Sequence, residues 1–100
     1  MTREYFEISA AVHAMLNIAQ IAVEVDDLER AALVEKDDLN IAYQDFKRRN
    51  GLTRIVRDSP EWEAMMEATK GEYAASEAAK RKVYNARRRL RSAIAAARPA

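Results

Sequence analysis

A run of cations near the end of the chain holds the residues whose types and spacing could do chemistry. It covers residues 80–91, where Tyr84 stands among seven lysines and arginines. Cationic side chains with an interleaved aromatic ring can follow the phosphates of a nucleic acid or meet an acidic protein surface. The candidate binding residues for a protein partner or a nucleic acid are Lys80, Arg81, Lys82, Tyr84, Arg87, Arg88, Arg89 and Arg91.

Three interpretations of this basic segment stay open. It could be a solvated helix face that pairs with acids of a second protomer, a docking face for a protein partner, or a nucleic-acid site. Residues that read base edges are lacking around Tyr84, and phosphate contacts alone carry no sequence information. A protein partner is therefore the preferred expectation, with nucleic-acid binding as the alternative.

Residues for catalysis or metal binding are scarce. His13 is the only histidine, there is no cysteine, and no glycine-rich loop is present to cradle phosphates. Neither Ser9 nor Asn17 gives His13 a good second metal ligand at helical spacing. The aspartate pairs at 26–27 and 37–38 lack the loop glycine and the alternating oxygen ligands of a calcium-binding loop. We expect no enzyme activity, no metal and no cofactor.

Helix-terminating and helix-initiating signals lie close together in the middle of the chain. Lysine and arginines at 47–49 suit the last turn of a helix, and Asn50-Gly51 follows as a left-handed cap. Ser59 can cap a new helix, with Pro60 at its first position. The sequence predicts a helix over about 3–49, a turn over 50–59 and a second helix over about 60–97.

The predicted helices carry apolar stripes with alternating steps of three and four residues, the pattern of an antiparallel two-helix hairpin with coiled-coil-like packing. The pattern continues through Asp37-Asp38, so we expect the first helix to be unbroken. Its stripe is Ile18, Ile21, Val25, Leu28, Ala32, Leu39, Ala42 and Phe46. The stripe of the second helix is Trp62, Met66, Thr69, Tyr73, Ser76, Ala79, Val83, Ala86, Leu90, Ile94 and Ala97.

If the predicted helix ends, residues 49 and 60, lie opposite each other, the numbers of any two residues that face each other across the hairpin sum to about 109. Residues 3–45 hold ten acids and three bases, whereas residues 80–98 hold eight bases and no acid. In this register the acids of 24–38 lie beside Lys80, Arg81 and Lys82. The four arginines at 87–89 and 91 fall beside residues 18–22, which contain no acid. We therefore expect these arginines to have no partner within the hairpin.

The two predicted helices differ in apolar content, which predicts self-association. The first carries 17 large apolar side chains and the second carries eight, so the second cannot cover the first. A lone two-helix hairpin also buries little surface per residue. We expect a homodimer that forms a four-helix bundle. The candidate self-association residues are Ile8, Val12, Met15, Ile18, Ile21 and Val25.

Composition limits the class of protein. One hundred residues, with 20 alanines and two glycines, favour a single all-α domain over 1–100. The start of the chain lacks a basic region typical of a signal peptide, and residues 8–25 hold too many polar groups for a membrane span. We expect a cytoplasmic interaction protein of the kind found among bacterial or phage accessory and inhibitor proteins. A structural or scaffolding element is a further alternative.

Overall fold

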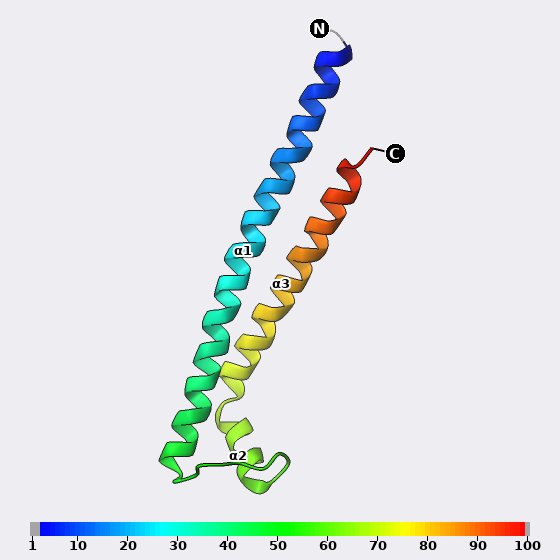
Figure 1. Ribbon diagram of the computed structural model, residues 1–100. Coiled ribbons are helices and arrows are strands. Elements are labelled where there is room, and N and C mark those ends of the chain that lie inside the picture. Colours follow the sequence, from blue (N-terminus) through cyan, green and yellow to red (C-terminus); the bar gives the residue numbers. More distant parts are fainter. Residues whose placement is uncertain (1–2, 100) are drawn as a thin grey trace.

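The chain forms an all-helical hairpin, as the sequence predicts. The computed structural model describes residues 3–99, with side chains described from residue 9 onward. The helices are α1 (Arg3–Arg49), α2 (Pro60–Ala68) and α3 (Lys70–Ala97). Figure 1 shows α1 and α3 running antiparallel side by side, with α2 at the end of the rod where the chain turns. The rod measures 74 × 20 × 17 Å, and the described residues contain no strand.

The first helix ends at the predicted glycine cap. Gly51 has a φ of 64°, which glycine adopts without a steric penalty. The Leu52 N–H donates to the Lys47 carbonyl at 2.8 Å, and the Gly51 N–H donates to the Arg48 carbonyl at 3.2 Å. These two bonds form a Schellman motif, which satisfies carbonyls that the last helical turn leaves free. The predicted continuity of α1 through Asp37-Asp38 is confirmed.

The second helix begins at the predicted serine cap. Ser59 is extended, with φ −78° and ψ 164°, and its hydroxyl oxygen accepts from the Trp62 N–H at 3.2 Å. The same hydroxyl donates to the Val56 carbonyl at 2.6 Å, so it also ties the turn to the helix. Pro60 occupies the first position of α2, where a helix needs no N–H from the backbone.

Replacing Ser59 with alanine should therefore destabilise the fold by about 1 kcal/mol, the usual loss for an N-cap hydroxyl. Thermal denaturation followed by circular dichroism measures the change. Ser59→Asp is the matched variant, because its carboxylate can accept the same bond and should retain most of the stability. Equal melting temperatures for wild type and Ser59→Ala would show that this cap contributes nothing.

The predicted second helix, over about 60–97, is divided at Thr69 into α2 and α3. This residue has φ −111° and ψ 15°, outside helical geometry. Its hydroxyl donates to the Met65 carbonyl at 2.7 Å, and its N–H donates to the same carbonyl at 3.0 Å. A hydroxyl that bonds to the carbonyl four residues earlier bends helices. Thr69 is only 4% exposed, so the break lies in the interior of the hairpin and redirects the chain from α2 into α3.

The core is thin and contains small side chains. Val25 of α1 and Val83 and Ala86 of α3 are buried, and Ala86 is completely inaccessible. Ser76 is also buried on the inward face of α3. An alanine and a serine at the contact let two helix backbones approach closely. The predicted inward stripe is right at these α3 positions and wrong at Tyr73, which is 42% exposed. It also misses the buried Met65 of α2.

The predicted register holds near the turn and is wrong further along. Tyr43 contacts Met66, and their numbers sum to 109 as expected. However, Glu29 binds Arg87, a pair that sums to 116. Twenty-one residues separate Met66 from Arg87, whereas 14 separate Tyr43 from Glu29. Two straight helices with the same rise per residue would advance equally, so the break between α2 and α3 takes up the extra chain.

Candidate interaction surfaces

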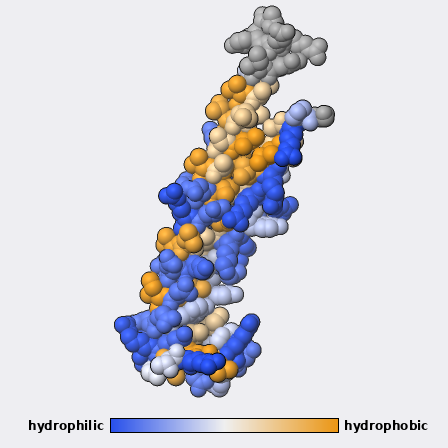
Figure 2. All heavy atoms as spheres, viewed as in Figure 1, coloured by the Kyte–Doolittle hydropathy of each residue, from blue (hydrophilic) through white to orange (hydrophobic). Residues whose placement is uncertain are grey.

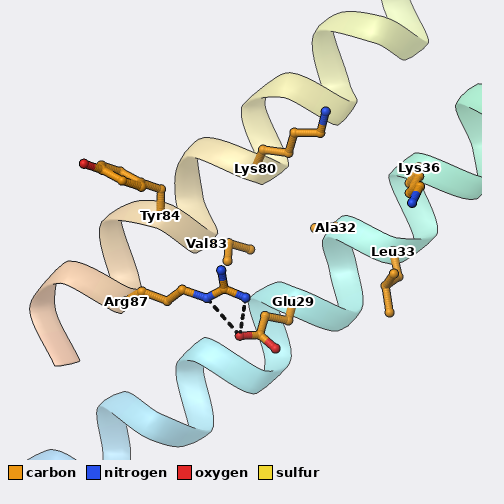
Figure 3. Close-up of a pocket in the computed structure, with 8 residues that line it drawn as sticks. All are labelled: Glu29, Ala32, Leu33, Lys36, Lys80, Val83, Tyr84 and Arg87. Carbon is orange, nitrogen blue, oxygen red and sulfur yellow. Dashed lines mark hydrogen bonds and ion pairs between the residues drawn. The ribbon is translucent and has the colours of Figure 1, made fainter. Parts of the chain in front are cut away.

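An open groove runs between α1 and α3 in the middle of the rod, with a volume of about 380 Å³. Ala32 and Leu33 of α1 and Val83 of α3 supply apolar lining. Figure 3 shows Tyr84 on α3, with the ion pair between Arg87 and Glu29 linking the two helices beside Val83. The remaining lining residues are the cations Lys36 and Lys80. The groove therefore combines apolar surface with positive charge at its sides.

Two ion pairs join the helices, which contradicts the expectation that Arg87 and Arg89 have no partner within the hairpin. The Arg87 Nη2 lies 3.0 Å from the Glu29 carboxylate, at the groove just described. Arg89 binds Glu24 through both terminal nitrogens, at 2.7 and 2.9 Å. Arg89 lines a second hollow that does not include Arg87, so the two pairs lie on opposite flanks of the helix contact. The shift in register is what brings the acids to these arginines.

The ion pair between Glu24 and Arg89 shifts the pKa of both groups. The hydrogen bond from Arg89 lowers the pKa of Glu24 below its ordinary value of 4.5; desolvation opposes this change, and the charge of Arg89 adds a smaller lowering effect. The same bond raises the pKa of Arg89. A carboxylate with a lowered pKa in the folded state stabilises the fold above its unfolded pKa, and this contribution is lost as the pH falls through the folded value.

We therefore expect the stabilising effect of Glu24 to begin to fall near pH 4.5 and to be lost as the pH drops through the lower folded pKa. The difference in melting temperature between wild type and Glu24→Gln should be largest near pH 6 and should shrink steadily toward pH 3. Asp27→Asn provides the matched control, because it removes an exposed acid of α1 that has no ion pair with a described side chain. A difference between wild type and Glu24→Gln that stays constant with pH would contradict the assignment.

A basic stripe runs along the solvent-exposed side of α3, where Tyr84 also borders the groove. We define the stripe as Arg81, Tyr84, Arg88 and Arg91, whose steps of three, four and three place them on one side of the helix. All four are exposed, whereas Val83 and Ala86 between them are buried against α1. The Arg88 guanidinium lies 5.9 Å from the centre of the Tyr84 ring, within reach of a cation–π interaction.

The structure separates the predicted binding residues into two groups. Lys80 pairs with Glu77 on its own helix at 3.1 Å, and Arg87 and Arg89 pair with α1. The other cations of the segment form no ion pair with a described side chain. They are Arg81, Lys82, Arg88 and Arg91.

The predicted self-association residues also fall into two groups. Val25 is buried, and Ile18 and Ile21 are half-buried on the side of α1 that faces α3. Val12 and Met15 are 51% and 67% exposed. The side chain of Ile8 lies outside the described residues.

Sequence reasoning missed further exposed apolar side chains of α1. They are Leu16, Val23, Leu33, Val34 and Ile41, each 58–66% exposed. All but Leu33 recur at steps of seven, eleven and seven residues on the side of α1 opposite Val25, a second stripe that alanines and charged residues interrupt.

His13 is exposed on α1. Among residues with described positions, no three histidine, aspartate or glutamate side chains gather closely enough to hold a metal ion.

Burial raises the pKa of Tyr43, and the nearby Tyr73 adds to the effect. The phenol therefore stays protonated where it contacts the Met66 sulfur.

Within the described part of the chain, no helix is both long and apolar enough to cross a lipid bilayer. Comparison of the sequence with protein-family models and curated proteins, and of the chain with solved structures, finds no match.

Proposed function

We propose that this protein is a non-enzymatic helical interaction protein that self-associates and binds a protein partner through its charged helix faces. The observation that carries the proposal is the exposed apolar surface of α1. Contiguous apolar patches larger than a few hundred Å² are uncommon on monomers and mark interaction sites. A second hairpin could cover this surface in a four-helix bundle. The side chains that support it are Val12, Met15, Leu16, Val23, Val34 and Ile41.

The groove supports the choice of a protein as the further partner. Its apolar lining at Leu33, Val83 and Tyr84 suits the apolar side of an amphipathic helix. Lys36 and Lys80 beside it favour acidic residues along the edges of that helix. The expected partner segment is therefore an amphipathic helix with leucine-like residues on one side and glutamate or aspartate next to them.

Multi-angle light scattering over a range of concentrations tests self-association. Wild type should show a mass above the 11.4 kDa of one chain. The double variant Leu16→Asp with Val23→Asp should shift toward one chain, because both side chains lose apolar contact and gain buried charge. Val56→Asp is the matched control, since Val56 is 67% exposed in the turn. A helical wild-type protein of monomer mass at 100 µM would overturn the proposal.

Partner binding is tested with a fluorescent helical peptide that has leucines at positions i, i+3, i+4 and i+7, flanked by glutamates. Fluorescence anisotropy should show binding to wild type and a loss of at least tenfold in affinity for Lys36→Glu with Lys80→Glu. Arg54→Glu with Arg57→Glu changes the same charge in the turn and should leave binding intact. Equal losses in both double variants would show non-specific attraction rather than recognition in the groove.

Nucleic-acid binding is the second candidate function, and the basic stripe favours it. Arg81, Arg88 and Arg91 project from one side of α3 with the Tyr84 ring between them. Such a row can contact successive phosphates and stack on an unpaired base. Apart from its arginines, which suit phosphates as well as guanine edges, the stripe carries no side chain that reads bases, so we expect binding with little dependence on sequence.

A gel-shift titration at two salt concentrations decides between these two functions. If the stripe binds nucleic acid, affinity should fall steeply with salt, because each neutralised phosphate releases counterions. Changing Arg81, Arg88 and Arg91 to glutamine should then abolish binding. The matched control changes Arg48, Arg54 and Arg57 to glutamine and removes the same charge. The absence of salt-sensitive binding by wild type would eliminate this candidate and leave the protein partner.

A further inference from the structure

The first half of α1 presents an apolar patch without a charge in it. We define the patch as seven exposed residues that lie within less than half of the helix circumference. No lysine, arginine, aspartate or glutamate occurs between Ile8 and Val23. Figure 2 shows hydrophobic side chains gathered over this half of the rod, whereas hydrophilic ones alternate with them further along. The patch consists of Ala11, Val12, Met15, Leu16, Ala19, Ala22 and Val23.

Nothing in the described chain covers this patch. Helix α3 ends at Ala97, and α1 extends past that end (Figure 1). Ile21 lies beside Ser92 and Ala93, so α3 runs alongside only the later part of the patch. Even there, the patch residues stay exposed, and Val12, Leu16 and Val23 lie on the side of α1 opposite the buried Val25.

We propose that this patch packs against the same patch of a second copy, with the two α1 helices antiparallel and opposite residue numbers summing to about 35. The inference rests on the self-association proposed above and specifies its surface and direction. In this register Leu16 lies opposite Ala19 of the second copy, and Val12 lies between Ala22 and Val23 of the second copy. Leu16 thus meets a small side chain, and Val12 packs between a small one and a valine, which lets the two helices pack closely.

Charge favours a second copy over other occupants. A partner with a charged face would bury unpaired charge against the patch, which is strongly unfavourable. The same chain supplies an apolar, charge-free surface of matching length. An alternative antiparallel register, with numbers summing to about 57, would place Val23 opposite Val34. It would also set Ala19 against Asp38 and Val12 against Asp45, which lie next to the patch around α1. In the first register the acid opposite the patch is Glu24, which lies further around the helix and already pairs with Arg89.

The size of the contact sets the expected affinity. The seven side chains, of which the larger four are 51–67% exposed, offer on the order of 1,000 Å² in total from two copies, at the low end for specific interfaces. We therefore expect a dimer that dissociates at roughly micromolar concentrations, tighter if contacts beyond the patch contribute.

Cysteine cross-linking tests the register, because the natural chain has no cysteine. The full-length variants Val12→Cys and Val23→Cys are oxidised separately and as a mixture at 100 µM. In the proposed register each residue lies about 16 Å from its own counterpart along the helices, beyond the reach of a disulfide. We expect a cross-linked dimer in the mixture and little in either variant alone. Circular dichroism confirms that both variants fold.

The other outcomes are distinct. Cross-linking of each variant with itself would show a parallel pair and overturn the inference. Cross-linking of Val23→Cys with Val34→Cys, and not with Val12→Cys, would establish the alternative register and overturn it as well. No cross-link in samples that light scattering shows to be dimers would overturn this register and leave the proposed self-association standing. Monomers in the same samples would overturn both.

Discussion

Replacing Ala86 with leucine should lower the free energy of unfolding by about 1–3 kcal/mol, the usual effect of adding methylenes to a packed contact. Ala86 is completely inaccessible on the face of α3 that meets α1. A leucine there has no free volume to occupy, so it would push the two helices apart. For a domain of this length, each kcal/mol corresponds to about 4–8 °C in melting temperature, so the change is easily measured.

Ala95→Leu is the matched control for this substitution. It adds the same atoms to the same helix at an exposed position, and leucine is nearly as good a helix former as alanine. Denaturant unfolding of both variants should give a large loss for Ala86→Leu and a change within about 0.5 kcal/mol for Ala95→Leu. Equal stabilities would mean that α1 and α3 do not pack closely at Ala86.

The second large effect should come from the turn. Gly51→Ala should destabilise the hairpin by about 1–2 kcal/mol, because a side chain resists the left-handed conformation. Gly51 has a φ of 64°, and a methyl group added there would meet no atom within 4 Å. The loss would therefore come from the backbone conformation alone and not from a clash.

Gly71→Ala provides a control with the opposite sign. Gly71 lies in the first turn of α3, where an added methyl group also meets open space and the backbone is not left-handed. Alanine there should stabilise the protein by up to about 1 kcal/mol, because glycine is a poor helix former. Two glycine-to-alanine changes in one chain should thus move the melting temperature in opposite directions. Destabilisation by both would indicate that α3 begins elsewhere.

The core and the surface of the hairpin have different roles. The apolar core holds Val25, Val83, Ala86 and Met65, and small buried residues add little apolar area to it. The two ion pairs between the helices are exposed, and such pairs contribute little to stability. They do mark the register, because Glu24 and Glu29 meet arginines on opposite flanks of the contact. A thin core is consistent with a fold that gains stability from a second chain.

The register also changes the interpretation of the basic segment. Arg87 and Arg89 are engaged with α1, so substituting them would weaken the hairpin as well as any binding. Arg81, Arg88 and Arg91 face outward and can be replaced without removing a contact to α1. Experiments on binding should therefore use the outward set. The predicted self-association residues are divided in the same way, since Ile18 and Ile21 lie toward α3 while Val12 and Met15 are exposed.

The sequence alone determined the features that depend on neighbouring residues. Gly51 ends α1 and Ser59 begins α2, because caps are made by hydrogen bonds within a few residues. The apolar periodicity determined that α1 is one continuous helix and that Val25, Val83 and Ala86 face inward. Both kinds of signal are local and repeat along the chain, so they can be recognised without knowledge of the fold.

Only the tertiary structure decided the break at Thr69 and the pairing of distant residues. The Thr69 hydroxyl bonds to the Met65 carbonyl together with the Thr69 N–H, an arrangement that bends a helix here, although threonine occurs inside helices elsewhere. Once the helix breaks there, the residues facing Arg87 and Arg89 change by one to two turns. Which residues face each other depends on all of the chain between them, so one local change in helix geometry shifts every later contact. Thus Arg87 and Arg89 find acids, Glu29 and Glu24, where the expected register offered them only residues 18–22, which hold none.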